Sequence, residues 1–391
     1  MIIYNKRGLK HLRIWEEAEA AYDAGLLSEL DLKQIKSAYP DLLYRPNLIT
    51  RIGYFILMLI GCSFTCLLIT LLFEAAHVIE HPAWPLFLGL CSYAALELFV
   101  RNKSDFHSGL DDALLWFTSG LLGGGLIWAL SDQPNSTLLI SACILLLSSW
   151  FALRFVNTLM SSIACLAALA LVFFTWNKAG TIGEATMPFV IMLSSYLIYN
   201  LAQRITSGQK AIYYQKCLSF VKVTSLLSLY AAGNYLVVQK LSNQLHHLPA
   251  ETNDPIPFGW IFWGWTCLLP LVYIALGIRT KSLLLLRVGL MLIAAAAYTV
   301  RFYFQVLSIE YVLVISGAVV LSLIIAILKY LKTPKMGFTY AQRSRRHWLN
   351  NLNLESLIVA GLASHTQSLP IETKDRFGGG SFGGGGASSN F

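Results

Sequence analysis

Long apolar runs alternate with short polar segments along most of the chain. A helix that crosses the hydrocarbon core of a bilayer needs about 20 mostly apolar residues, and ten runs approach or reach that length. Their residue ranges are 52–73, 84–100, 113–130, 137–153, 158–176, 187–202, 217–238, 258–278, 283–300 and 311–328. The third, fourth and sixth runs are the weakest, since the third contains three consecutive glycines and the sixth is short. The pattern predicts an all-α, polytopic transmembrane helix bundle of about ten spans.

The basic residues give a second, independent view of this threading. With both termini placed in the cytoplasm, 24 of the 29 lysines and arginines fall in inner segments and only three, Lys178, Lys240 and Arg301, fall in outer loops. Lysine and arginine favour the cytoplasmic side of short loops. Removing one central span would invert every later loop and spoil this asymmetry. We therefore expect ten spans with both termini cytoplasmic, including a tight hairpin at residues 154–157.

The composition narrows the class of protein further. Of the 391 residues, 56% are hydrophobic and 13% are charged, about half the charge of a typical soluble chain. A soluble enzyme, a disordered protein, a nucleic-acid-binding domain and a secreted disulfide scaffold are all excluded. The seven cysteines lie inside apolar runs, where small packing residues are expected rather than disulfides or zinc ligands.

Residues 1–48 predict a small cytoplasmic pair of helices before the bundle. The first, at residues 7–24, has one apolar face and is followed by Gly25, a residue that commonly ends helices. The second begins with Ser28 and Asp31, which have the spacing of a capping box, and stops at Pro40.

A family resemblance rests on these same residues. The stretch from Trp15 through Gly25-Leu26-Leu27-Ser28 to Ile35, followed by a linker and a glycine-containing apolar helix, resembles the start of a bacterial family of predicted membrane proteins of unknown function. In that family a cytoplasmic helical pair precedes eight to ten spans. The resemblance implies a bacterial inner-membrane protein, and it brings no catalytic residues with it.

The spans 49–330 are followed by two different terminal segments. Residues 331–376 are expected to form a basic cytoplasmic tail that includes a segment suited to an interfacial helix. Residues 377–391 are rich in glycine and are expected to be disordered, with Phe377, Phe382 and Phe391 as the candidate contacts for a partner. This ending is similar to that of bacterial membrane proteins that carry a TPM domain, although the TPM domain itself is absent here.

Few polar residues within the apolar runs are candidates for a functional site. Glu97 is expected to pair with Arg101 along one helix face, and Lys222 and Arg287 are expected to extend toward the helix ends. A transport pathway, if present, would be lined by Glu97, Asn200, Asn234 and Arg287.

Histidines on the outer side are the other candidates. His77 and His81 are one helical turn apart, and His246 and His247 lie in a later outer loop. Together they are a candidate zinc site, but ordinary solvated loops explain them more simply. No catalytic residue and no cofactor is predicted.

These observations favour a non-enzymatic integral membrane protein, a structural or accessory component that acts through partner proteins. Its expected partners are the lipid bilayer and another membrane protein or complex, and not a nucleic acid. Two alternatives stay open: a transporter of small molecules or lipids, and a membrane-embedded enzyme with its site at the outer histidines.

Overall fold

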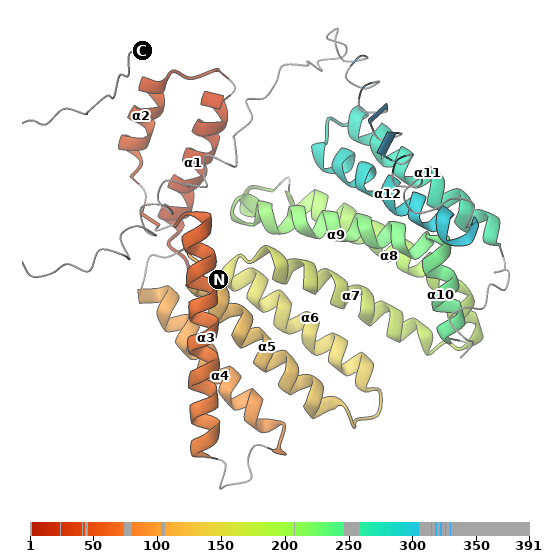
Figure 1. Ribbon diagram of the computed structural model, residues 1–391, viewed down its shortest axis with the longest axis horizontal. Coiled ribbons are helices and arrows are strands. Elements are labelled where there is room, and N and C mark those ends of the chain that lie inside the picture. Colours follow the sequence, from red (N-terminus) through yellow and green to blue (C-terminus); the bar gives the residue numbers. More distant parts are fainter. Residues whose placement is uncertain are drawn as a thin grey trace, which may run out of the picture. The chain divides into compact units, whose positions relative to one another are not determined.

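The computed structural model describes residues 2–23, 25–40, 42–43, 46–73, 80–102, 106–206, 208–245 and 258–304, with isolated positions between 314 and 329. All the elements described are helices and belong to the unit Met1–Arg346 (Figure 1). Eight of them are long and apolar enough to cross a membrane, and a ninth span results if one bent pair of helices is counted as a unit. The prediction of an all-α, polytopic helix bundle is confirmed.

The helices follow the apolar runs closely. Two of them precede the spans, α1 (Lys6–Asp23) and α2 (Glu29–Ala38). The spans are α3 (Leu48–Leu72), α4 (Ala83–Asn102), α5 (Leu110–Leu130), α6 (Ser136–Phe155), α7 (Thr158–Asn177), α8 (Thr181–Thr206), α9 (Gln215–Gly233) with α10 (Tyr235–Leu245), α11 (Gly259–Arg279) and α12 (Leu283–Phe304). A 3-10 helix, η3 (Gln209–Tyr214), connects α8 to α9. The tenth predicted span, 311–328, lies outside the described residues except for isolated positions.

The predicted ends of the first two helices are confirmed. At the end of α1, Gly25 has a φ of +73°, and the amides of Gly25 and Leu26 donate to the carbonyls of Tyr22 and Ala21. At the start of α2, the Ser28 hydroxyl accepts from the Asp31 amide while the Asp31 carboxylate accepts from the Ser28 amide. These two caps define the turn between α1 and α2.

The glycine-rich third run forms one continuous helix, α5. A Cβ atom at Gly125 would lie 2.9 Å from the Leu86 side chain, and one at Gly89 on α4 would lie 2.7 Å from the Leu122 side chain. Glycine therefore allows α4 and α5 to approach closely, which is a common use of small residues between membrane helices. The hairpin expected at residues 154–157 is also present, with Val156 at a φ of +52° and Asn157 capping α7.

The seventh span differs from its prediction, because the helix breaks inside the apolar run. The axes of α9 and α10 meet at 70°, and Asn234 between them has an extended backbone. Its side-chain oxygen accepts from the Leu236 amide at 3.0 Å, and its amide nitrogen donates to the Tyr230 and Thr299 hydroxyls, each at 3.0 Å. The break is thus held by one capping side chain rather than by proline.

Candidate functional site

Polar side chains from three segments that are distant in the sequence meet in a cluster at the start of α5. We call it the polar joint and define it as Tyr4, Arg51, His107, Asp111 and Asp112. Tyr4 precedes α1, Arg51 lies in the first turn of α3, His107 precedes α5, and the two aspartates lie in the first turn of α5. Acidic residues are favoured at that position because the helix N-terminus carries a partial positive charge.

Asp111 holds the centre of the polar joint and is only 2% exposed. One carboxylate oxygen accepts from the Tyr4 hydroxyl at 3.0 Å and from the His107 amide at 2.9 Å. The other accepts from the Ser108 amide at 2.9 Å and the Ser108 hydroxyl at 3.2 Å. Burial raises the pKa of the Tyr4 phenol, and the adjacent Asp111 carboxylate raises it further. Tyr4 therefore remains a hydrogen-bond donor well above neutral pH.

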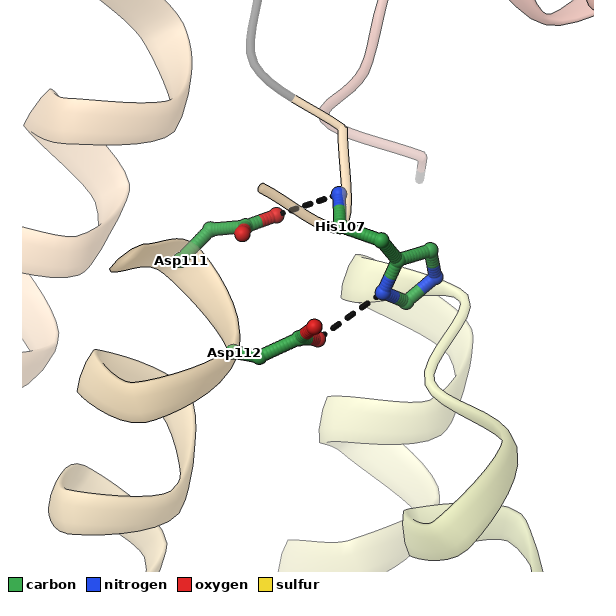
Figure 2. A group of neighbouring side chains, drawn as sticks. All are labelled: His107, Asp111 and Asp112. Carbon is green, nitrogen blue, oxygen red and sulfur yellow. Dashed lines mark hydrogen bonds and ion pairs between the residues drawn. The ribbon is translucent and has the colours of Figure 1, made fainter. Parts of the chain in front are cut away.

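Asp112 binds two cationic or ionisable groups. Its oxygens lie 2.5 Å from Arg51 Nη2 and 2.8 Å from His107 Nδ1. Figure 2 shows how His107 contacts both aspartates, with its backbone nitrogen toward Asp111 and its ring toward Asp112. The carboxylate fixes the ring orientation and favours the tautomer protonated at Nδ1.

Gly109 allows this arrangement to form. Its φ is +99°, and a Cβ atom added there would lie 2.2 Å from the Arg51 carbonyl oxygen. Only glycine combines this backbone conformation with such a close approach. The residue thus determines how near the loop before α5 comes to the start of α3.

A cavity of about 450 Å³ adjoins the polar joint. Arg51, His107 and Asp112 line it, together with Trp116 of α5 and the residues Asn157–Leu159 at the start of α7. An aspartate–histidine pair beside a cavity is suited to proton exchange. The contacts described for His107 include no serine, threonine or cysteine side chain, so the geometry does not indicate a nucleophilic triad.

Metal binding is the other chemistry that this residue set suggests. One ligand atom each from His107, Asp111 and Asp112 lie within 4.8 Å of one another. All four carboxylate oxygens already accept hydrogen bonds, and Arg51 supplies the positive charge beside Asp112. A cation would have to compete with these donors. The arrangement is better suited to joining the N-terminal segment to the bundle than to holding an ion.

The polar candidates predicted for a transport pathway lie on different elements. Glu97 of α4 forms an ion pair with Arg154 of α6, so the expectation that it pairs with Arg101 on its own helix is wrong. Asn200 of α8 donates to the Tyr196 carbonyl of the same helix at 2.9 Å. Asn234 caps α10, as described above. Arg287 of α12 is exposed. The contacts of Glu97, Asn200 and Asn234 are therefore local or structural, and the three share no partner.

Lys222, which was expected to extend toward a helix end, is 8% exposed and therefore buried on α9. The buried position follows from the packing of α9, which contacts α7, α8, α11 and α12.

Most of the other candidates lie outside the described residues. This is so for His77, His246 and His247, and for Phe377, Phe382 and Phe391. His81 is described and exposed, and its Nδ1 accepts from the Ala83 amide at 3.2 Å. The predicted zinc site and the predicted partner contacts of the tail stay predictions.

The polar joint was not among the sites predicted from the sequence. A local signal was present, because two adjacent acids after Gly109 directly precede the apolar run of α5. Such a pair at a helix start is typical of dipole compensation. Its partners were not visible in the sequence, since Tyr4 is 107 positions and Arg51 is 61 positions away.

Comparison with protein-family models, with curated proteins and with solved structures finds no match.

Proposed function

We propose that this multi-pass membrane protein is a non-enzymatic accessory component that acts through a partner membrane protein. The helical pair α1–α2 is its docking surface, and the inner membrane of a bacterium is its proposed location. The observation that carries the proposal is the exposure of large apolar side chains on this pair. Leu26 is 79% exposed and Leu30 is 72% exposed, although both lie outside the predicted spans.

Weak packing between the two helices supports this role. No residue of α2 is buried. Its contacts with α1 include polar ones, among them Lys36 with Glu19 at 3.0 Å and the Trp15 indole with the Tyr39 carbonyl at 2.7 Å. A helix without a fully buried residue leaves its exposed apolar residues, such as Leu30, available to another protein.

The attachment of α1 to the bundle gives the docking surface a fixed base. The Tyr4 hydroxyl binds Asp111, the Ile3 amide donates to the Arg154 carbonyl at 3.2 Å, and Lys216 pairs with Glu16 at 2.8 Å. These contacts reach α5, α6 and α9. A partner bound to α1–α2 is therefore linked, through these contacts, to three membrane helices.

The test is purification of the tagged full chain in a gentle detergent after brief cross-linking. We expect a membrane protein to co-purify in stoichiometric amount. The double variant Leu26→Ser and Leu30→Ser should lower the amount recovered at least tenfold, because it removes the apolar contact surface. Circular dichroism and thermal unfolding should stay as in the wild type, since both side chains are exposed.

The matched control changes two exposed polar residues of the same pair, Glu29→Ser and Lys33→Ser, which form only a surface ion pair. This variant should keep its partner. Purification of the wild-type chain alone, or an undiminished partner with the leucine variant, would contradict the proposal.

The orientation of this surface follows from the proposed topology of ten spans with cytoplasmic termini. Single cysteines placed at Lys178 and Ser207 in a cysteine-free background test it. Lys178 follows α7 and should react with a membrane-impermeant thiol reagent added outside, whereas Ser207 after α8 should not. Labelling at Ser207 would place α1–α2 outside the cell and would contradict a cytoplasmic partner.

A further inference from the structure

A second cavity, of about 900 Å³, lies between α6, α7, α8, η3 and the first turns of α9. It shares no lining residue with the cavity beside the polar joint. Its floor consists of buried residues, namely Ala152, Ser161, Cys165 and Cys217. The volume is within the range of about 300–1,000 Å³ that ligand sites occupy.

The wall of this cavity offers an apolar surface. The Tyr214 hydroxyl donates to the Leu153 carbonyl at 2.9 Å. The Ser161 hydroxyl lies 2.6 Å from the Thr158 carbonyl and 3.2 Å from the Cys217 carbonyl. These two hydroxyls are thus engaged within the protein, and Ser149 supplies the third hydroxyl of the lining. A polar ligand would find few groups to replace its hydrogen bonds to water, so the cavity suits a hydrocarbon chain.

One side of the cavity is open. Leu153, Ile205 and Gly208 line it and are exposed, in contrast to the floor. Leu153 and Ile205 belong to membrane-spanning helices, α6 and α8. The opening therefore lies where lipid surrounds the protein, and a chain enters from the bilayer without crossing water.

The depth of the cavity matches that of a lipid chain. Lining residues on α7 extend from Ser161 to Ala168, and Ala168 is ten residues beyond the start of this helix. At 1.5 Å per residue the lining stretch of α7 is about 10 Å long, and Ala168 lies about 15 Å from the start of the helix, half of a hydrocarbon core about 30 Å thick. The cavity thus extends from the end of the span to the middle of the bilayer.

The shallow end of the cavity is basic. The segment 204–216 carries Arg204, which is exposed, and Lys216, which pairs with Glu16 at 2.8 Å. Ile205, Gly208 and Ala211 of this same segment line the cavity. Positive charge where a span meets the cytoplasmic headgroup layer attracts anionic lipids.

We propose that this cavity holds one acyl chain of an anionic phospholipid, whose headgroup lies beside the exposed Arg204 at the end of α8. The chain fills the space between α7, α8 and α9, and its end reaches Ala168. This assignment is independent of the proposed partner at α1–α2, because it rests on other helices and on another ligand.

Photocross-linking in nanodiscs tests the proposal directly. The full-length protein is reconstituted with phosphatidylglycerol that carries a diazirine near the end of one acyl chain, and cross-linked peptides are mapped by mass spectrometry. We expect the cross-links to concentrate at residues 161–168 and 217–221. The variant Ala168→Trp, which fills the cavity, should reduce them at least fivefold, and Ala164→Leu provides a milder filling if the tryptophan disturbs folding.

Two controls make the result decisive. Leu166→Trp changes the exposed side of α7 and should leave the cross-links at 161–168 in place. Arg204→Gln should reduce the preference for phosphatidylglycerol over phosphatidylcholine about threefold without moving the cross-linked positions. Cross-links spread over all lipid-facing helices, or insensitive to both filling variants, would overturn the site. Equal capture of both lipids by the wild-type chain would overturn the anionic headgroup.

Discussion

The polar joint and the apolar cavity between α6, α7, α8 and α9 have opposite character, although α7 lines both the apolar cavity and the smaller cavity beside the polar joint. In the polar joint, five side chains from distant segments use their hydrogen-bonding groups on one another. In the apolar cavity, the hydroxyls of Ser161 and Tyr214 bind backbone carbonyls and leave hydrocarbon facing the space. A polar cluster whose groups are hydrogen-bonded to one another stabilises the fold but offers few free hydrogen-bonding groups to a ligand. The apolar surface of the cavity, in contrast, remains available to an apolar ligand.

The largest effect is expected from Asp111→Asn. The amide cannot accept on both sides, so two of the buried donors that now face Asp111 would lose their acceptor. Unsatisfied buried donors cost about 1–3 kcal/mol each, and we expect a loss of about 3 kcal/mol in the free energy of unfolding. Hydrogen exchange should increase at residues 2–23, because Tyr4 is released.

Asp132→Asn is the matched control for this change. Asp132 is exposed, and its described contact is a long hydrogen bond from the Ser131 hydroxyl, at 3.4 Å. Its replacement should alter stability by less than about 0.5 kcal/mol. If Asp111→Asn were equally mild, the polar joint would not hold the N-terminal segment, and its aspartates would be free for another role.

A smaller effect is expected when a larger side chain is introduced beside the polar joint or in the wall of the apolar cavity. Gly109→Ala puts a methyl group against the Arg51 carbonyl and forces alanine into a left-handed conformation, which should cost about 2 kcal/mol. Ala164→Val adds two methyl groups to the wall of the open cavity and should change stability by less than about 0.5 kcal/mol. Chemical unfolding in bicelles measures both. Equal destabilisation would show that the apolar cavity is closed in the membrane.

The smallest effect is expected from Tyr4→Phe, which removes one hydrogen bond worth about 1 kcal/mol. Its pH dependence distinguishes it from a packing change. The pKa of the Tyr4 phenol is raised in the folded protein, so the stability it contributes is complete below the unfolded value of about 10 and decreases as the pH rises above it. The difference between wild type and variant should be constant from pH 6 to 9 and shrink in stronger alkali. A constant difference at all pH values would contradict the role of the hydroxyl.

The spans and the caps could be predicted because their causes are local. Bilayer thickness requires apolar runs of a fixed length, and Ser28 and Asp31 are only three residues apart. The partners of Asp111, Glu97 and Asn234 could not be predicted, because Tyr4, Arg154 and Thr299 reach them through tertiary packing. The apolar cavity could not be predicted for the same reason. Small residues such as Ala164 and Ala168 are common in membrane spans, and only the packing of the helices shows that they line a cavity.

The break at Asn234 has a consequence for the path of the seventh span. The apolar run continues to Val238, yet α9 stops after 19 residues, a length of about 28 Å. The two helices α9 and α10 are apolar enough to cross a membrane only when they are counted together. The side-chain amide of Asn234, and not the end of the hydrophobic sequence, thus sets where α9 stops and where the chain turns inside the apolar run.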